Sequence, residues 1–177
     1  MIEMVSTCRR NLLGIVVLVL GLLCGATNGL ASPPTETRPN DAAALEGLES
    51  VRTVFLVNKA TAGETARYLR GIRATHESLK EQNVTPSTVV VFLGPPVQFI
   101  TTAPAVAVAA ENSRALESIA ETTSDLEALG VRMEVCAAAT KHFGVDNDSL
   151  LPGMEAVGNG FISLIGWQSK DYVPMTF

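Results

Sequence analysis

The chain has 177 residues, a formal net charge of −5 at pH 7, 47% hydrophobic residues and three cysteines. Its acidic balance and singly scattered basic residues give no attraction to nucleic acid or to an anionic membrane surface, so no nucleic-acid partner is expected. The length suits one domain large enough to bury a core without disulfides.

The N-terminal segment predicts a secretory signal peptide over residues 1–31. Arg9 and Arg10 form a positive start, an apolar run follows over residues 12–23, and small residues precede a cleavage site after Ala31. The apolar run is shorter than the ~20 residues of a spanning helix, which favours a cleaved signal over a membrane anchor. The expected location is therefore periplasmic or extracellular, with membrane contact only if the segment stays uncleaved.

Cleavage decides which cysteines remain. It removes Cys8 and Cys24 together with one acidic and two basic residues, so the net charge changes from −5 to −6 and Cys136 is left unpaired. Lipidation at Cys24 is an alternative, although Leu23 stands where a lipoprotein signal has a small residue. The adjacent arginines also fit a loose twin-arginine signal, so the export route, either general secretion or the twin-arginine route, stays open.

Residues 32–50 are polar and contain Pro33, Pro34 and Pro39, which predicts a flexible leader. The ordered domain is expected over residues 51–177. Its apolar runs and helical periodicities predict elements in alternation. Strands are expected over 51–57, 88–93, 131–135, 154–157 and 172–175, and helices over 64–82, 111–129, 137–143 and 160–169. Apolar strands separated by helices indicate an α/β fold with a mainly parallel sheet, helices on both faces and right-handed crossovers.

Cys136 is the main candidate for chemistry because it follows a buried strand and precedes a helix. Reactive groups collect at the carboxyl ends of parallel strands, and the positive end of a helix starting at Ala137 would favour a thiolate. Lys141 and His142 follow within two turns and could add positive charge or handle a proton. The alternatives are that Cys136 is a small buried core residue and that His142 is an ordinary surface residue.

Two further features each have two interpretations. The apolar stripe of Phe161, Leu164, Ile165 and Trp167 either packs on the sheet or partly faces another subunit. The loop Gly94-Pro95-Pro96 is either the rim of a ligand pocket or a simple chain terminator.

Several familiar kinds of site are missing from the sequence. It has no Cys-x-x-Cys dithiol and no glycine-rich phosphate loop after the first strand, and its two histidines lack a metal-ligand spacing. We therefore expect no cofactor and no metal.

Several segments, in their order and spacing, resemble the DsrE/DsrF-like (DsrE/YchN-type) family of sulfur-relay proteins. The resemblance covers residues 51–177. It rests on Val89–Thr101, Leu129–Cys136, Gly144-Val145, Leu150–Gly153, Gly160–Gln168 and Tyr172–Pro174.

The resemblance implies a small three-layer, Rossmann-like α/β domain that assembles into trimers or hexamers. It also implies that Cys136 carries sulfane sulfur as a persulfide and passes it to a partner thiol, which makes the chain an exported sulfurtransferase or sulfur carrier with donor and acceptor proteins. The alternative is a non-catalytic ligand-binding or oligomeric assembly module whose free thiol is incidental. Dimerisation through a Cys136 disulfide is a third possibility.

Overall fold

The computed structural model describes residues 39–176, so the signal peptide expected over 1–31 lies outside the described residues, as does the leader up to residue 38. The described end of the leader contains a short helix, α1 (Ala42–Leu45). The Asp41 backbone N–H donates to Gln82 Oε1 at 2.8 Å, and Gln82 Nε2 donates to Asp41 Oδ2 at 3.1 Å. These two bonds tie residue 41 to the residue that follows the second helix.

Five strands form one sheet in the order β4-β3-β2-β1-β5, and every neighbouring pair is parallel. The strands are β1 (Ser50–Val57), β2 (Thr85–Phe92), β3 (Arg132–Cys136), β4 (Met154–Val157) and β5 (Val173–Met175). Their carboxyl ends lie at the same edge, so the loops that follow them meet there. The parallel sheet expected from the sequence is confirmed.

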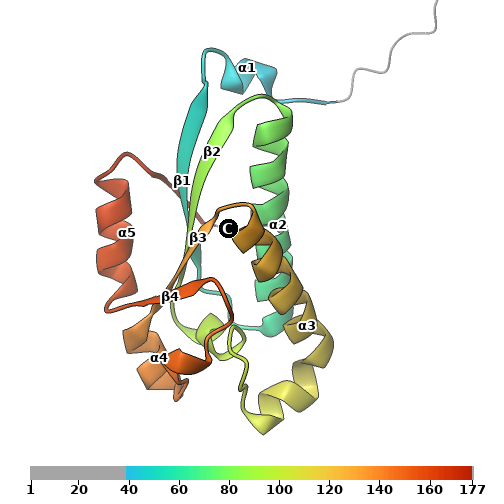
Figure 1. The fold of residues 1–177 in the computed structure, drawn as a ribbon, viewed down its shortest axis with the longest axis vertical. Coiled ribbons are helices and arrows are strands. Elements are labelled where there is room, and N and C mark those ends of the chain that lie inside the picture. Colours follow the sequence, from blue (N-terminus) through green and yellow to red (C-terminus); the bar gives the residue numbers. More distant parts are fainter. Residues whose placement is uncertain (1–38, 177) are drawn as a thin grey trace, which may run out of the picture. The chain divides into compact units, whose positions relative to one another are not determined.

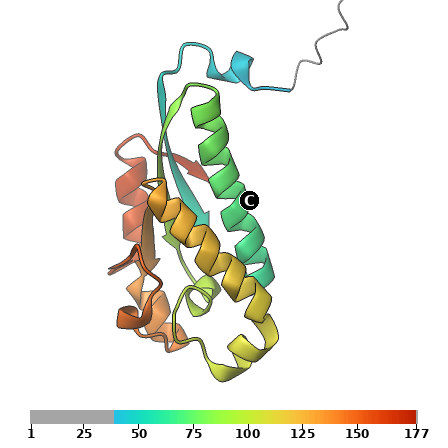
Figure 2. The ribbon, with the colours of Figure 1, turned by 45° about the vertical axis from the view of Figure 1, so that its right-hand side comes forward.

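Helices cover both faces of this sheet (Figures 1 and 2). The helices are α2 (Ala62–Glu81), α3 (Val106–Ala128), α4 (Ala137–Phe143) and α5 (Gly160–Gln168), with short 3₁₀ helices at Pro95–Gln98 and Asn147–Ser149. Helices α2 and α3 lie on one face and α5 lies on the other. The three-layer α/β fold is confirmed.

The direction of the crossovers explains why α5 lies on the sheet face opposite α2 and α3. The chain moves stepwise from β1 to β4, and right-handed crossovers made in one direction put their helices on one face. The step from β4 to β5 runs back across the whole sheet, so the same handedness puts α5 on the opposite face. Helix α5, with nine residues, therefore covers that face.

The element boundaries differ from expectation mainly at N-termini. Helix α2 begins two residues early because Thr61 and Glu64 form a capping box, in which each side chain accepts from the other residue's backbone N–H. Helix α3 begins at Val106, five residues before the expected start. Its first residues carry no side-chain cap, and its backbone kinks at Asn112, whose Nδ2 donates to the Val108 carbonyl at 3.0 Å.

The main core lies between the sheet and helices α2 and α3. It includes Phe55, Leu69, Phe92, Ile119 and Met133, all almost fully buried. The α5 side has a smaller core of Val54, Val89 and Val91, against which Leu164, Trp167 and Tyr172 pack. Within residues 39–176, no helix has both the length and the apolarity needed to cross a membrane.

Candidate functional site

Cys136 is the last residue of β3 and the residue before α4. It pairs in register with Val157, the last residue of β4, and only 4% of it is exposed. The left-handed Gly144 (φ 68°) ends α4, as its place in the sequence predicts. The structure therefore places the thiol at the carboxyl edge of the sheet, below the surface.

The first residue of α5 lies directly over Cys136. A Cβ placed on Gly160 would stand 3.1 Å from Cys136 Cβ, 3.0 Å from Leu93 Cδ1 and 3.5 Å from Val91 Cγ1. Only a residue without a side chain allows this approach at ordinary contact distance. Cys136 therefore contacts the start of α5 and is at the same time part of the main core, whereas Arg132 and Glu134 lie on the α5 side by the alternation of β3.

Lys141 and His142 are exposed and stand in the last turn of α4, whereas Cys136 precedes its first. At 1.5 Å rise per residue, five or six residues separate them from Cys136 by about 8 Å along the helix axis. The His142 ring contacts Phe143 edge-on, with 4.9 Å between ring centroids. The structure thus places these two candidates at the opposite end of α4 from the thiol.

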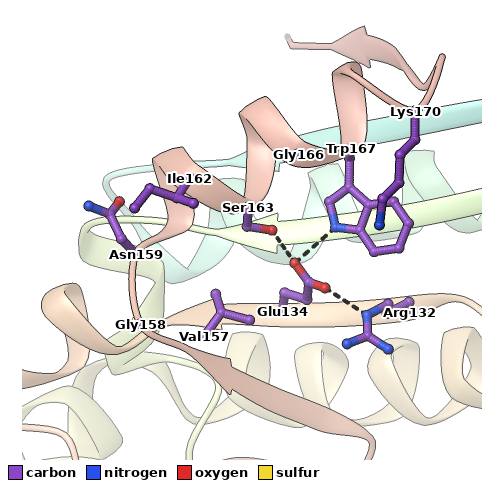
Figure 3. Close-up of a pocket in the computed structure, with 10 residues that line it drawn as sticks. All are labelled: Arg132, Glu134, Val157, Gly158, Asn159, Ile162, Ser163, Gly166, Trp167 and Lys170. Atoms are coloured by element: carbon purple, nitrogen blue, oxygen red, sulfur yellow. Dashed lines mark hydrogen bonds and ion pairs between the residues drawn. The ribbon is translucent and has the colours of Figure 1, made fainter.

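Glu134 is a buried charged residue that the sequence analysis did not select. It is 3% exposed, and its Oε2 accepts hydrogen bonds from Ser163 Oγ and from Trp167 Nε1, the latter at 3.0 Å (Figure 3). Its Oε1 accepts from Arg132 Nε at 2.6 Å. The sequence signal was present, since Glu134 is the one acidic residue in an otherwise apolar buried strand core.

Two opposing effects act on the pKa of Glu134. Burial raises it, because the charged form loses solvation, but the hydrogen bonds from Ser163, Arg132 and Trp167 stabilise the carboxylate and together hold the pKa below its ordinary value. Glu134 in turn raises the pKa of Arg132, chiefly through their hydrogen bond. Glu134 is therefore an ionised, fully partnered carboxylate between β3 and α5.

A cavity of about 670 Å³ opens beside this cluster. It is lined by Arg132, Glu134, Val157, Gly158, Asn159, Ile162, Ser163, Gly166, Trp167 and Lys170 (Figure 3). The Trp167 ring has two cations over it, Lys170 Nζ at 4.8 Å and the Arg132 guanidinium carbon at 5.8 Å from its centroid. Arg132 Nη2 also donates to Glu155 Oε2 at 2.5 Å, so Arg132 is paired with two carboxylates.

The loop Gly94-Pro95-Pro96 does not line this cavity. Gly94 has φ 80°, and the two prolines open the 3₁₀ helix Pro95–Gln98, in which Pro96 and Val97 are buried. Within residues 39–176, no group of three or more His, Cys, Asp or Glu side chains is arranged to hold a metal ion.

The apolar stripe of α5 is split between two environments. Leu164 and Trp167 pack on the sheet, whereas Phe161 and Ile165 are 60% and 63% exposed. Ile162, which the sequence analysis did not include, is 67% exposed. The helix thus contributes both a core contact and an exposed apolar face.

Solved structures share this fold. The protein of unknown function MTH1491 from Methanobacterium thermoautotrophicum is 18% identical with a TM-score of 0.57, and the ychN protein from E. coli is 21% identical with a TM-score of 0.53. Each match covers 72% of this chain and 99% of the other. No curated protein matches the sequence. Residues 51–177 match the DsrE/DsrF-like family, and with this coverage the chain belongs to the DsrE/DsrF-like family.

Proposed function

We propose that this protein carries sulfane sulfur as a persulfide on Cys136 and transfers it to a partner thiol. Membership of a family associated with sulfur relay supports the proposal. The observation that carries it is the position of Cys136 at the carboxyl end of β3, where parallel sheets collect their reactive groups. Among residues 39–176, Cys136 is the cysteine with a free thiol, and one thiol is enough to carry one sulfur atom.

The transfer consists of two displacements without net oxidation. The Cys136 thiolate attacks the outer sulfur of a donor persulfide R–S–SH, the donor S–S bond breaks, and R–S⁻ leaves while Cys136–S–SH forms. An acceptor thiolate then attacks the outer sulfur of Cys136–S–SH and leaves as R′–S–SH, which regenerates the Cys136 thiolate. The proton stays on the outer sulfur throughout, so no oxidant and no second cysteine are required.

Intact and peptide mass spectrometry after exposure to polysulfide tests the proposal. We expect a mass gain of one sulfur atom, about 32 Da, on the peptide that contains Cys136, and its removal by an added thiol. Cys136→Ala should lose the adduct, whereas the matched variant Cys8→Ser/Cys24→Ser should keep it. Lys141→Ala and His142→Ala test their supporting role through the loading rate. An unmodified Cys136 peptide in the folded protein contradicts the carrier function.

A second candidate function is an oligomeric assembly or ligand-binding module. The exposed apolar side chains Phe161, Ile162 and Ile165 favour it, because contiguous apolar surface marks interaction sites. We propose that this face contacts further copies of the chain in a trimer or hexamer. Assembly is compatible with sulfur transfer, and an inert Cys136 in an intact oligomer would favour the assembly module alone.

Export after cleavage at Ala31 remains part of the proposal. The charged start at Arg9 and Arg10 and the apolar run 12–23 support it. N-terminal sequencing of the protein isolated from its producing cells should begin at Ser32. A chain that retains its first residues in the soluble fraction would contradict export by a cleaved signal.

A further inference from the structure

The burial of Cys136 imposes a condition on sulfur transfer, and the inference below rests on the proposed function. Bond formation brings two sulfur atoms to about 2.05 Å, and the attacking, central and leaving sulfurs must all be accommodated. A thiol that is 4% exposed cannot meet the sulfur of a donor protein in this arrangement. An element that covers Cys136 must move before transfer occurs.

Within a single chain, helix α5 is a covering element that has little buried surface. Its first residue, Gly160, lies over Cys136 and is the one buried residue of the helix. Strand β2 and the rest of β3 are buried along most of their length in the centre of the sheet, and the edge strand β4, which pairs with Cys136 through Val157, is held by its ladder to β3. Elements with little buried apolar surface open at the lowest free-energy cost.

A polar cluster holds α5 against the sheet. The cluster is centred on Glu134, two residues before Cys136. Glu134 on β3 accepts hydrogen bonds from Ser163 and Trp167, both on α5, and these three residues lie between the two layers (Figure 3). Hydrogen bonds to a carboxylate are about twice as strong as those between neutral groups. Arg132 holds the other carboxylate oxygen from within β3, so Glu134 keeps an ionic partner when α5 leaves.

We propose that Glu134, Ser163 and Trp167 are positioning residues that hold α5 closed over Cys136, and that their hydrogen bonds set how often the thiol is accessible. The first turn of α5 lifts when these bonds break, which exposes Cys136 from the side of the 670 Å³ cavity. Gly158 precedes this turn with open space around it and can absorb the change in backbone direction.

The test is the rate at which iodoacetamide modifies Cys136 in the full chain, read on the Cys136 peptide by mass spectrometry so that Cys8 and Cys24 do not contribute. Ser163→Ala and Trp167→Phe should each raise the rate about tenfold, and the double variant should raise it further. Both substitutions leave the charges beside the thiol unchanged. Ser163→Ala is the cleaner of the two because Trp167 also packs on Tyr172.

Thr123→Val is the matched control. Thr123 is a buried hydroxyl on α3, on the other face of the sheet, and its Oγ1 donates to the Ala120 carbonyl at 3.0 Å. This variant should leave the modification rate within about twofold of that of the unsubstituted protein, because the Thr123 bond lies within α3 and does not hold α5. An equal increase in the control would show that general destabilisation, and not release of α5, exposes the thiol.

Urea distinguishes local opening from global unfolding. Local opening of α5 exposes little surface, so the modification rate of the unsubstituted protein should rise much less steeply with urea than the global unfolding constant. A rate that follows global unfolding overturns the proposal, and so does a rate equal to that of a free thiol. Unchanged rates in correctly folded Ser163→Ala and Trp167→Phe variants also overturn it.

The two proposals fail in different ways. If Cys136 gains sulfur from polysulfide but the α5 variants react at the original rate, the carrier function stands and the cover is wrong. If the α5 variants react faster with iodoacetamide while no variant gains sulfur, α5 is a cover and the carrier function is wrong.

Discussion

At the scale of single residues, Glu134 and Glu155 offer a direct comparison, since both pair with Arg132 but only Glu134 is buried. We expect Glu134→Gln to lower the free energy of unfolding by about 2 kcal/mol, because the amide cannot satisfy the three donors that face the carboxylate. Glu155→Gln should cost less than about 1 kcal/mol, as an exposed ion pair does. Urea unfolding measures both, and equal losses would contradict a special role for the buried carboxylate.

The pKa of Glu134 also predicts how stability depends on pH. Its folded-state pKa lies below its ordinary value of 4.5, so the folded protein binds fewer protons than the unfolded chain as pH falls. This contribution is fully present above pH 4.5 and is lost as pH falls through the folded pKa. The difference in unfolding free energy between the original protein and Glu134→Gln should therefore shrink on acidification. A difference that stays constant from pH 7 to pH 3 would contradict the lowered pKa.

At the scale of elements, two glycines in α5 should respond oppositely to the same substitution. Gly160→Ala puts a methyl group 3.0 Å from Leu93 and 3.1 Å from Cys136, which we expect to cost about 1 kcal/mol through displacement of the helix start. Gly166→Ala meets nothing within 4 Å and should stabilise the helix by about 0.5 kcal/mol. Thermal or urea unfolding measures both changes. A Gly160→Ala variant more stable than the unsubstituted protein would show that the start of α5 does not lie in close contact with Cys136 and Leu93.

At the scale of the whole molecule, the exposed face of α5 predicts self-association. Ile162→Glu and Ile165→Glu should shift the protein towards monomer in sedimentation analysis, because a charge at a buried interface loses solvation. Val106→Glu is the matched control, since Val106 is 87% exposed on α3 and does not belong to this face. Oligomers that persist in both α5 variants, or that dissociate equally in the control, would contradict the α5 interface.

The sequence by itself determined the order and type of the elements, because each signal is local. The apolar runs at 51–57 and 131–135 are confirmed as β1 and β3, and Gly130, the residue after the helix expected over 111–129, has the left-handed φ of 79° that ends a helix. The start of α3 was placed five residues late because nothing caps it, and a helix without a cap has no local sequence mark at its first turn.

Tertiary structure decided what surrounds the thiol. The sequence placed Cys136 at the end of a strand, but its burial under Gly160 depends on α5 returning across the opposite face from a position 24 residues later. The cluster of Glu134 with Ser163 and Trp167 joins residues about 30 positions apart for the same reason. A local pattern records which face of a strand a side chain takes, whereas the partners it meets there follow from how crossovers pack one layer on another.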